Sequence, residues 1–241
     1  MSTHAGPNTG FSTPVDYFGV TGGVECISSN SGTSGNVAEA QQADGSVCAY
    51  DTYGEKMSPS CEYLITGTIS GLPALGEVVT CGTGTDAKKI VVTNIAITTA
   101  AGDYPKLSIS GEEVQSDATS GTTWTVPVSG VSNAPKAQNV GGAFSSLPDT
   151  APVTSLSATY SCEVTTATAP DGSNSSEVVA FAVSKGKCEV SASMTLWGGE
   201  TEPTLATGWL QQSASESGAN EAYNTKELTL VKYLESDSNA S

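Results

Sequence analysis

Hydrophobic and polar residues alternate along much of the chain, most clearly over residues 188–197. One side of this stretch consists of Cys188, Val190, Ala192, Met194 and Leu196. The stretches 88–98 and 154–168 show the same period of two. This period predicts β-strands that bury one face and leave the other in water. Shorter runs predict further strands at 17–26, 47–53, 62–69, 77–81, 106–114, 124–128, 177–183 and 225–234.

Turn residues separate several of these runs. Asp44-Gly45, the segment 100–103 and Asp171-Gly172 are each typical of the tight turn of a hairpin. Because strands joined by short turns pair with each other, the chain is predicted to form an antiparallel sheet.

Helical patterns are scarce. The best candidate is a short helix at 134–146, and its proline and paired glycines oppose it. The segments 28–45 and 210–224 are long, polar and rich in Gly and Ser, which predicts loops. The segment 28–45 has almost no apolar anchor, so we interpret it as an arm that reaches a neighbouring subunit. The fold class expected is all-β: a β-sandwich or partly closed barrel with long loops and little helix.

The domain organisation expected is one β domain at 15–235, between a flexible segment 1–14 and a disordered tail 236–241. Two blocks, 62–114 and 154–234, each contain an alternating strand, a polar turn and a second strand. A division into halves 15–129 and 153–235, joined by a crossover at 130–152, is the alternative. A single sandwich or barrel with a long crossover is the simpler interpretation.

Charge narrows the range of functions. The 241 residues include 25 acidic and nine basic ones, for a net charge of −16, and every basic residue is a lysine. Because the chain is strongly acidic and contains no arginine, we do not expect it to recognise nucleic acid. His4 is the single histidine, which removes Ser-His and Cys-His pairs and multi-histidine metal sites. We therefore expect no enzyme, and no catalytic, cofactor-binding or metal-binding residues.

A glycine pattern resembles a dinucleotide fingerprint. Residues 82–87 match G-x-G-x-x-A after an apolar strand. The fingerprint requires a helix immediately afterwards, whereas 88–98 has the pattern of a strand, so a hairpin turn is the preferred interpretation.

Acidic and aromatic residues suggest two further kinds of site. The acids Asp51, Glu55 and Glu62, or Glu112 with Glu113, are potential carboxylate pairs for glycoside hydrolysis. In so acidic a chain, solvated strand edges and loops explain them better. The tryptophans Trp124, Trp197 and Trp209 are potential sugar platforms, but aromatic residues make up only 6% of the chain, so core positions are expected for most.

The six cysteines are Cys26, Cys48, Cys61, Cys81, Cys162 and Cys188. They form no C-x-x-C pair, and the N-terminus has no recognisable signal peptide. Free thiols are therefore expected, with Cys162 and Cys188 as inward neighbours on their strands. Disulfides are the alternative, since Cys26, Cys48, Cys61 and Cys81 could lie close together in one sheet. No run of about 18 apolar residues occurs, so no membrane span is expected.

Several stretches resemble structural proteins of tailed bacteriophages, in particular major tail, or tail-tube, proteins. They are YFGV at 17–20, QADGSVCAYD at 42–51, YLITGTI at 63–69, GEVVTCG at 76–82, IVVTNIAI at 90–97 and YPKLSISGE at 104–112. The resemblance covers most of residues 15–115 and extends to the hairpin at 156–196. The six cysteines and the extended middle segment depart from it.

The resemblance implies a subunit that assembles with itself into rings, commonly of six, stacked as a tube through which DNA passes without specific binding. It implies other virion proteins as partners and the virion as location, after assembly in the host bacterial cytoplasm. Two alternatives remain: another virion protein, such as a head-decoration or neck subunit, and an extracellular carbohydrate-binding β-sandwich. The last requires Trp197 or Trp209 to be exposed.

Overall fold

The computed structural model describes residues 13–82, 87–114, 119–145, 147, 153–171, 174–218 and 224–234. Within these ranges the chain forms strands and one 3-10 turn, with no α-helix. The strands are β1 (Gly22–Gln41), β2 (Val47–Ile69), β3 (Val78–Cys81), β4 (Lys88–Ala100), β5 (Asp103–Val114), β6 (Val153–Asp171), β7 (Asn174–Trp197), β8 (Leu210–Ser217) and β9 (Thr225–Tyr233), and the turn is η2 (Val140–Gly142). The prediction of an all-β fold is confirmed.

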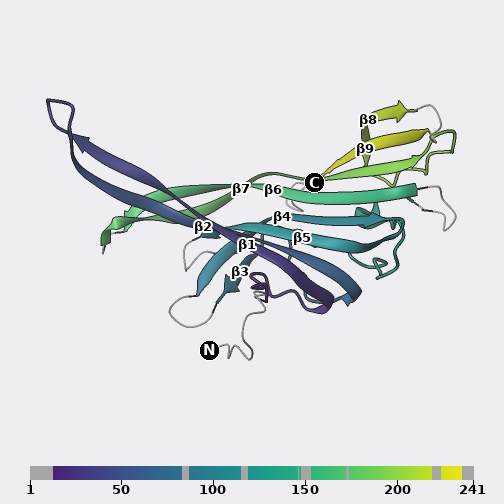
Figure 1. Ribbon diagram of the computed structural model, residues 1–241, viewed down its shortest axis with the longest axis horizontal. Coiled ribbons are helices and arrows are strands. Elements are labelled where there is room, and N and C mark those ends of the chain that lie inside the picture. The colour runs from purple at the N-terminus through teal and green to yellow at the C-terminus, as the bar shows by residue number, and fades with distance from the viewer. Residues whose placement is uncertain are drawn as a thin grey trace, which may run out of the picture.

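The strands form one antiparallel sheet in the order β1-β2-β5-β4-β6-β7-β9-β8, with β3 paired to the first part of β4. The sheet folds back on itself, so that β2 and β7 contact each other although they are not neighbours in this order (Figure 1). It does not close into a barrel. The fold is therefore sandwich-like.

The strand order repeats. In β1-β2-β5-β4 a long hairpin is followed by a second hairpin whose last strand pairs with the second strand of the first. The order β6-β7-β9-β8 has the same topology. Pairing of β4 with β6, from Asn94↔Ser161 to Ala100↔Ser155, joins both sets into one sheet.

The core lies on the inner face of this sheet. Cross-strand pairing aligns one buried row over six strands: Tyr63, Leu107, Ile97, Ala158, Ala192 and Leu230. Segments outside the strands cover this face with Phe18, Val126, Phe144 and Trp209. Burying these apolar side chains is the main stabilising contribution to the fold.

A buried polar contact fixes part of this cover. The backbone N–H of Gln138 donates to Thr99 Oγ1 at 2.9 Å, and the Gln138 side chain accepts from Ser132 N at 2.8 Å. Both Thr99 and Gln138 are buried, and these bonds remove the cost of burying their polar atoms. The segment around residues 132–138 is thus held against the end of β4.

Two predicted turns are confirmed. Between β1 and β2, Gly45 has φ +84° and Asp44 Oδ1 accepts from the Ser46 N–H at 2.9 Å. Between β4 and β5, Gly102 has φ +88°. A left-handed backbone costs glycine little, which explains its place in each turn. In the third predicted turn, Gly172 lies outside the described residues.

Three predicted segments differ from the structure. Most of 28–45 is strand, because β1 runs to Gln41, and β8 occupies the first part of 210–224. The outer part of β1 and the whole of β8 are exposed and are held by backbone pairing without a buried face, so they carry little hydrophobic alternation. The candidate helix at 134–146 is reduced to η2, and the strand expected at 124–128 is only a bridge from Trp124 to Leu75.

Candidate assembly surface

The outer face of the sheet is covered by small polar residues. Cross-strand partners point to the same side, so the strand register aligns the outward residues in rows. One row is Asn30, Ser60, Ser110, Asn94, Ser161 and Glu189. The next is Ser28, Glu62, Ser108, Ala96, Thr159 and Ser191, and a third contains Lys106, Thr98, Ser157, Ser193 and Thr229. We call this surface the hydroxyl face.

Lysines that reach the hydroxyl face are paired with carboxylates. Lys106 Nζ lies 3.3 Å from Glu62 Oε1, and Lys187 Nζ lies 2.7 Å from Glu189 Oε2. The hydrogen bond that Lys187 donates to Glu189 holds the pKa of Lys187 above its usual value. Because these pairs are exposed, they contribute little to stability. Each pair does balance the positive charge of its lysine with a neighbouring carboxylate on this surface.

A shallow groove of about 530 Å³ lies on the hydroxyl face across β1, β2, β4 and β5. Its lining includes Ser28, Asn30, Glu62, Asn94 and Ser110, and it contains no aromatic side chain. Hydroxyls, amides and one carboxylate paired with lysine give neither an activated nucleophile nor a stacking platform. Among the described residues, no cluster of three His, Cys, Asp or Glu side chains is placed to hold a metal ion.

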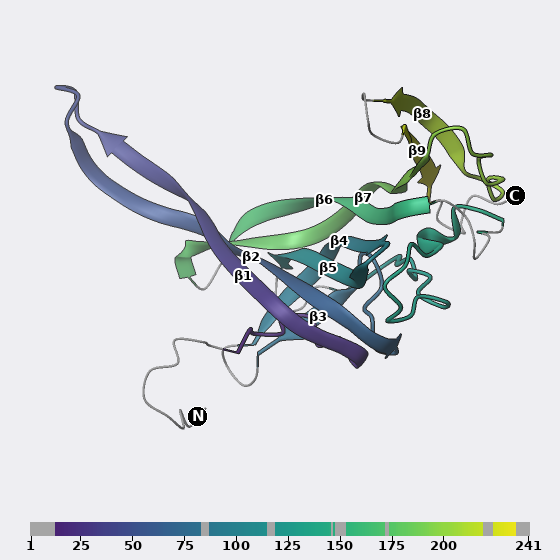
Figure 2. The same ribbon diagram turned by 45° about the vertical axis from the view of Figure 1, so that its right-hand side comes forward.

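Two ribbons extend from the sheet. The first, the β1–β2 arm, comprises residues 31–59, which continue beyond the last pairing of β2 with β5 at Ser60. The second, the β6–β7 arm, begins after Cys162 and ends before Cys188. Figures 1 and 2 place both arms at the same end of the molecule, the first projecting far from the body.

The outer part of the β1–β2 arm is exposed to solvent. All the side chains described between residues 31 and 49 are exposed, including Val37 at 58% and Val47 at 47%. A two-stranded ribbon in water is only marginally stable. Contact with another molecule would bury these side chains and stabilise the arm.

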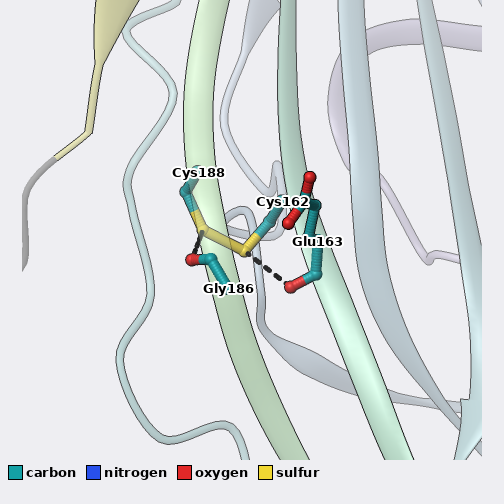
Figure 3. The surroundings of a disulfide bond; sticks show 4 residues. All are labelled: Cys162, Glu163, Gly186 and Cys188. Atoms are coloured by element: carbon teal, nitrogen blue, oxygen red, sulfur yellow. Dashed lines mark hydrogen bonds between the residues drawn. A yellow bond between two sulfur atoms is a disulfide. The ribbon is translucent and has the colours of Figure 1, made fainter.

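Cys162 and Cys188 form a disulfide at the root of the β6–β7 arm (Figure 3). The prediction that this pair would remain free is wrong. The two residues are direct partners in the strand register, with Cα atoms 4.1 Å apart, which brings the sulfurs together. The carbonyl oxygens of Glu163 and Gly186 lie 3.9 Å and 3.7 Å from the sulfurs.

The other four cysteines are free. Cys61 is buried on β2, and its thiol lies 3.4 Å from the carbonyl oxygen of Val15. Burial, with smaller effects from Cys61, raises the pKa of Cys26 to about 11 and also raises that of Cys81. Cys48, by contrast, lies exposed on the β1–β2 arm.

Among the candidate acids whose side chains are described, Glu62, Glu112 and Glu113 are not arranged as a catalytic pair. Glu62 lies beside Lys106, and Glu112 and Glu113, consecutive on a strand, point to opposite faces. Glu113 instead binds Lys88 at 2.7 Å and accepts the Met57 N–H at 2.9 Å. The side chains of Asp51 and Glu55 lie outside the described residues, as does His4.

The glycine pattern at 82–87 lacks the helix that a dinucleotide site needs. After it, β4 begins at Lys88 and pairs antiparallel with β3. Residues 83–86, the centre of the pattern, lie outside the described residues. The flanking strands are those of a hairpin, in agreement with the interpretation from sequence.

The tryptophans do not share one surface. Trp209 is buried, and its ring lies near Gly141, where an added Cβ would be 3.7 Å from it. Trp124 is half-buried beside Leu75. Trp197, at the end of β7, is 47% exposed.

The strand order ends at β1 and β8, and β3, which pairs only with β4, is a further short edge. All eight side chains of β8 are exposed, and neither β1 nor β8 contains a lysine or a proline. Natural edge strands usually carry such residues to prevent pairing with another chain. Sequence reasoning missed the edges at β1 and β8 because neither β8 nor the outer part of β1 alternates between apolar and polar residues.

No helix within the described part of the chain is long and apolar enough to cross a membrane. Comparison with models of known protein families gives no match, and comparison with curated proteins gives none either.

Proposed function

We propose that this protein is a virion structural subunit of the tail-tube type, whose copies join edge to edge into rings and stack into a conduit for DNA. The observation that carries the proposal is the continuous sheet whose end strands, β1 and β8, contain neither lysine nor proline. If β8 of one copy pairs with β1 of the next, the contact is heterologous and generates a ring where the rotation closes.

The hydroxyl face suits the wall of a conduit. It offers Ser and Thr side chains, and Lys106 and Lys187 are paired with acids. A chain with net charge −16 and no arginine repels the DNA phosphates instead of binding them. DNA that passes such a wall would not be retained.

The two arms supply contacts between subunits. The exposed β1–β2 arm has side chains such as Val37 and Val47 to bury against a neighbour. Ordering an arm costs conformational entropy, which buried apolar area on assembly would offset. Other virion proteins are the remaining partners, and the virion is the location, as the resemblance implies.

The experiment is to image the purified protein by negative-stain microscopy and to measure its mass by light scattering. The test variant is Ala214→Lys, which places a charge on β8 where every side chain is exposed. The matched control, Ser193→Lys, adds the same charge to an exposed position of the central strand β7. We expect rings or tubes for the wild type and the control, and smaller particles for Ala214→Lys. Normal assembly of Ala214→Lys would refute the edge-pairing model.

The images also separate the alternatives within virions. Tubes support a tail-tube subunit, whereas discrete oligomers without tubes favour a head-decoration or neck protein. Isolated monomers at every concentration would contradict self-assembly.

A carbohydrate-binding function has one supporting observation, the exposure of Trp197. An exposed indole ring can stack on the apolar face of a sugar. If the wild type binds glycans on an array and Trp197→Ala does not, the result would favour carbohydrate binding. If the wild type binds none, carbohydrate binding is excluded.

A further inference from the structure

The two long hairpins carry cysteines at corresponding places. In the first, Cys26 lies on β1 and Cys61 on β2; in the second, Cys162 lies on β6 and Cys188 on β7. The cysteine on the second strand lies where that strand starts to pair with the next hairpin. On β2 this pairing starts at Ser60, and on β7 it starts at Glu189. Each hairpin thus has two cysteines at the root of its arm.

The residues next to these cysteines also correspond. Glu62 follows Cys61 and Glu189 follows Cys188, and each glutamate reaches the hydroxyl face, where it pairs with a lysine. The same strand order in both halves makes these positions equivalent. Only the second pair, Cys162 and Cys188, is bonded.

The strand register differs between the two pairs. Cys162 is directly opposite Cys188, whereas Cys26 is opposite Tyr63 and Cys61 is opposite Ser29. Cys26 and Cys61 are therefore diagonal neighbours, and Cys26 packs against the core that contains Cys61. Bond formation requires movement of β1, an edge strand that pairs only with β2 among the described residues.

We propose that Cys26 and Cys61 are a redox-modification site that closes a second disulfide, the counterpart of Cys162–Cys188, when the chain meets a small-molecule disulfide. The thiolate of Cys26 attacks the small disulfide, forms a mixed disulfide and releases one small thiolate. The Cys61 thiolate then attacks the Cys26 sulfur of the mixed disulfide and displaces the second small thiolate. Two protein thiols are oxidised, one small disulfide is reduced, and the two protons end on the two released thiols.

The order of attack follows from burial. Cys61 is only 3% exposed, and the segment at Val15 and Tyr17 covers it. The backbone N–H of Tyr17 donates to the sulfur of Cys61, with nitrogen and sulfur 3.5 Å apart. Cys26 is half-buried near the sheet edge, so it meets the oxidant first. The new bond would join β1 to β2 and restrict the root of the β1–β2 arm. This inference does not depend on self-assembly.

The experiment incubates the full chain with oxidised glutathione at about pH 8.5, where more thiolate forms. Free thiols are then alkylated and the protein is cut after glutamate without reduction. Cleavage after Glu25, Glu39, Glu55, Glu62 and Glu77 puts Cys26, Cys48, Cys61 and Cys81 on separate peptides. The expected product links peptide 26–39 to peptide 56–62, with neither Cys26 nor Cys61 alkylated. The link between Cys162 and Cys188 serves as the internal reference.

Two variants sharpen the result. In Cys61→Ser the reaction should stop at the mixed disulfide on Cys26, and in the control Cys48→Ser the 26–39/56–62 link should form as in the wild type. Alkylation of both Cys26 and Cys61 while the Cys162–Cys188 link is intact would overturn the proposal. A link from Cys61 to Cys81, or from Cys26 to Cys48, would overturn it equally, because the pairing would be wrong.

Discussion

Asp16 accepts a 2.5 Å hydrogen bond from the hydroxyl of Tyr63, a residue of β2 that is only 1% exposed. The same oxygen, Oδ1, accepts the N–H groups of Phe18 at 3.1 Å and Gly19 at 2.9 Å. One carboxylate thus satisfies a buried hydroxyl and folds the N-terminal segment over the core. This contact places Phe18 on the inner face of the sheet.

Tyr63→Phe should destabilise the protein by about 1–3 kcal/mol, because the Asp16 carboxylate loses its buried partner. The matched control is Tyr160→Phe, since Tyr160 is equally buried but its hydroxyl has no hydrogen-bond partner among the described residues. That substitution should be neutral or stabilising. Urea unfolding of both variants checks this expectation, and equal losses for the two would contradict it.

The protein should lose stability at alkaline pH. Burial, helped by the bond to Asp16, raises the pKa of Tyr63 above its usual range, and burial raises that of Tyr160. Burial likewise raises the pKa of Cys26 to about 11. Groups with a raised folded pKa stabilise the protein fully below their unfolded pKa, which is about 8.5 for cysteine and about 10 for tyrosine. The stabilisation is lost as pH rises above these values.

Urea unfolding between about pH 7 and about pH 10.5 measures this loss. The free energy of unfolding should begin to fall near pH 9 and fall more steeply near pH 10, where unfolded tyrosines ionise. Tyr160→Phe should reduce the steeper fall, because one linked proton is removed. A free energy that stays constant over this range would show that the raised pKa values have no effect on folding.

Removing the disulfide should cost about 3 kcal/mol, since the bond closes a loop between residues 26 positions apart. The double variant Cys162→Ser/Cys188→Ser avoids an unpaired thiol. Its control is Cys48→Ser, at an exposed thiol, which should leave the urea midpoint unchanged. A midpoint for the double variant equal to that of the wild type would contradict the stabilising role.

Strands with one buried face were predictable from sequence because burial imposes the period of two. The stretch 188–197 alternates and lies in β7, with Val190 and Met194 in the core. The outer part of β1 and the whole of β8 were missed because both of their faces are exposed. At 124–128 the alternation was real but misleading, since Val126 covers the sheet instead of joining it.

The candidate surface was less predictable because it depends on register. Alternation identified Ser161 and Ser191 as outward residues, but only the pairing of β6 with its neighbours places them in rows with Asn94 and Ala96. The same holds for Cys162 and Cys188, which the pattern placed inward without making them partners. Register over long distances comes from tertiary packing, which a period of two does not specify.

The β1–β2 arm should be dispensable for folding and required for assembly. Deleting residues 34–56 and joining Thr33 to Met57 through Asp-Gly preserves a registered pair and the bond from Met57 to Glu113. The side chains described at 34–49 are exposed, so their loss removes no core contact. The urea midpoint should stay close to that of the wild type, while light scattering and microscopy should show fewer and smaller assemblies.

A control with Val37→Ser and Val47→Ser keeps the length of the β1–β2 arm and tests whether its exposed apolar side chains make the contact between subunits. If the shortened chain assembles like the wild type, the arm does not join subunits; if it fails to fold, the arm belongs to the stabilising core.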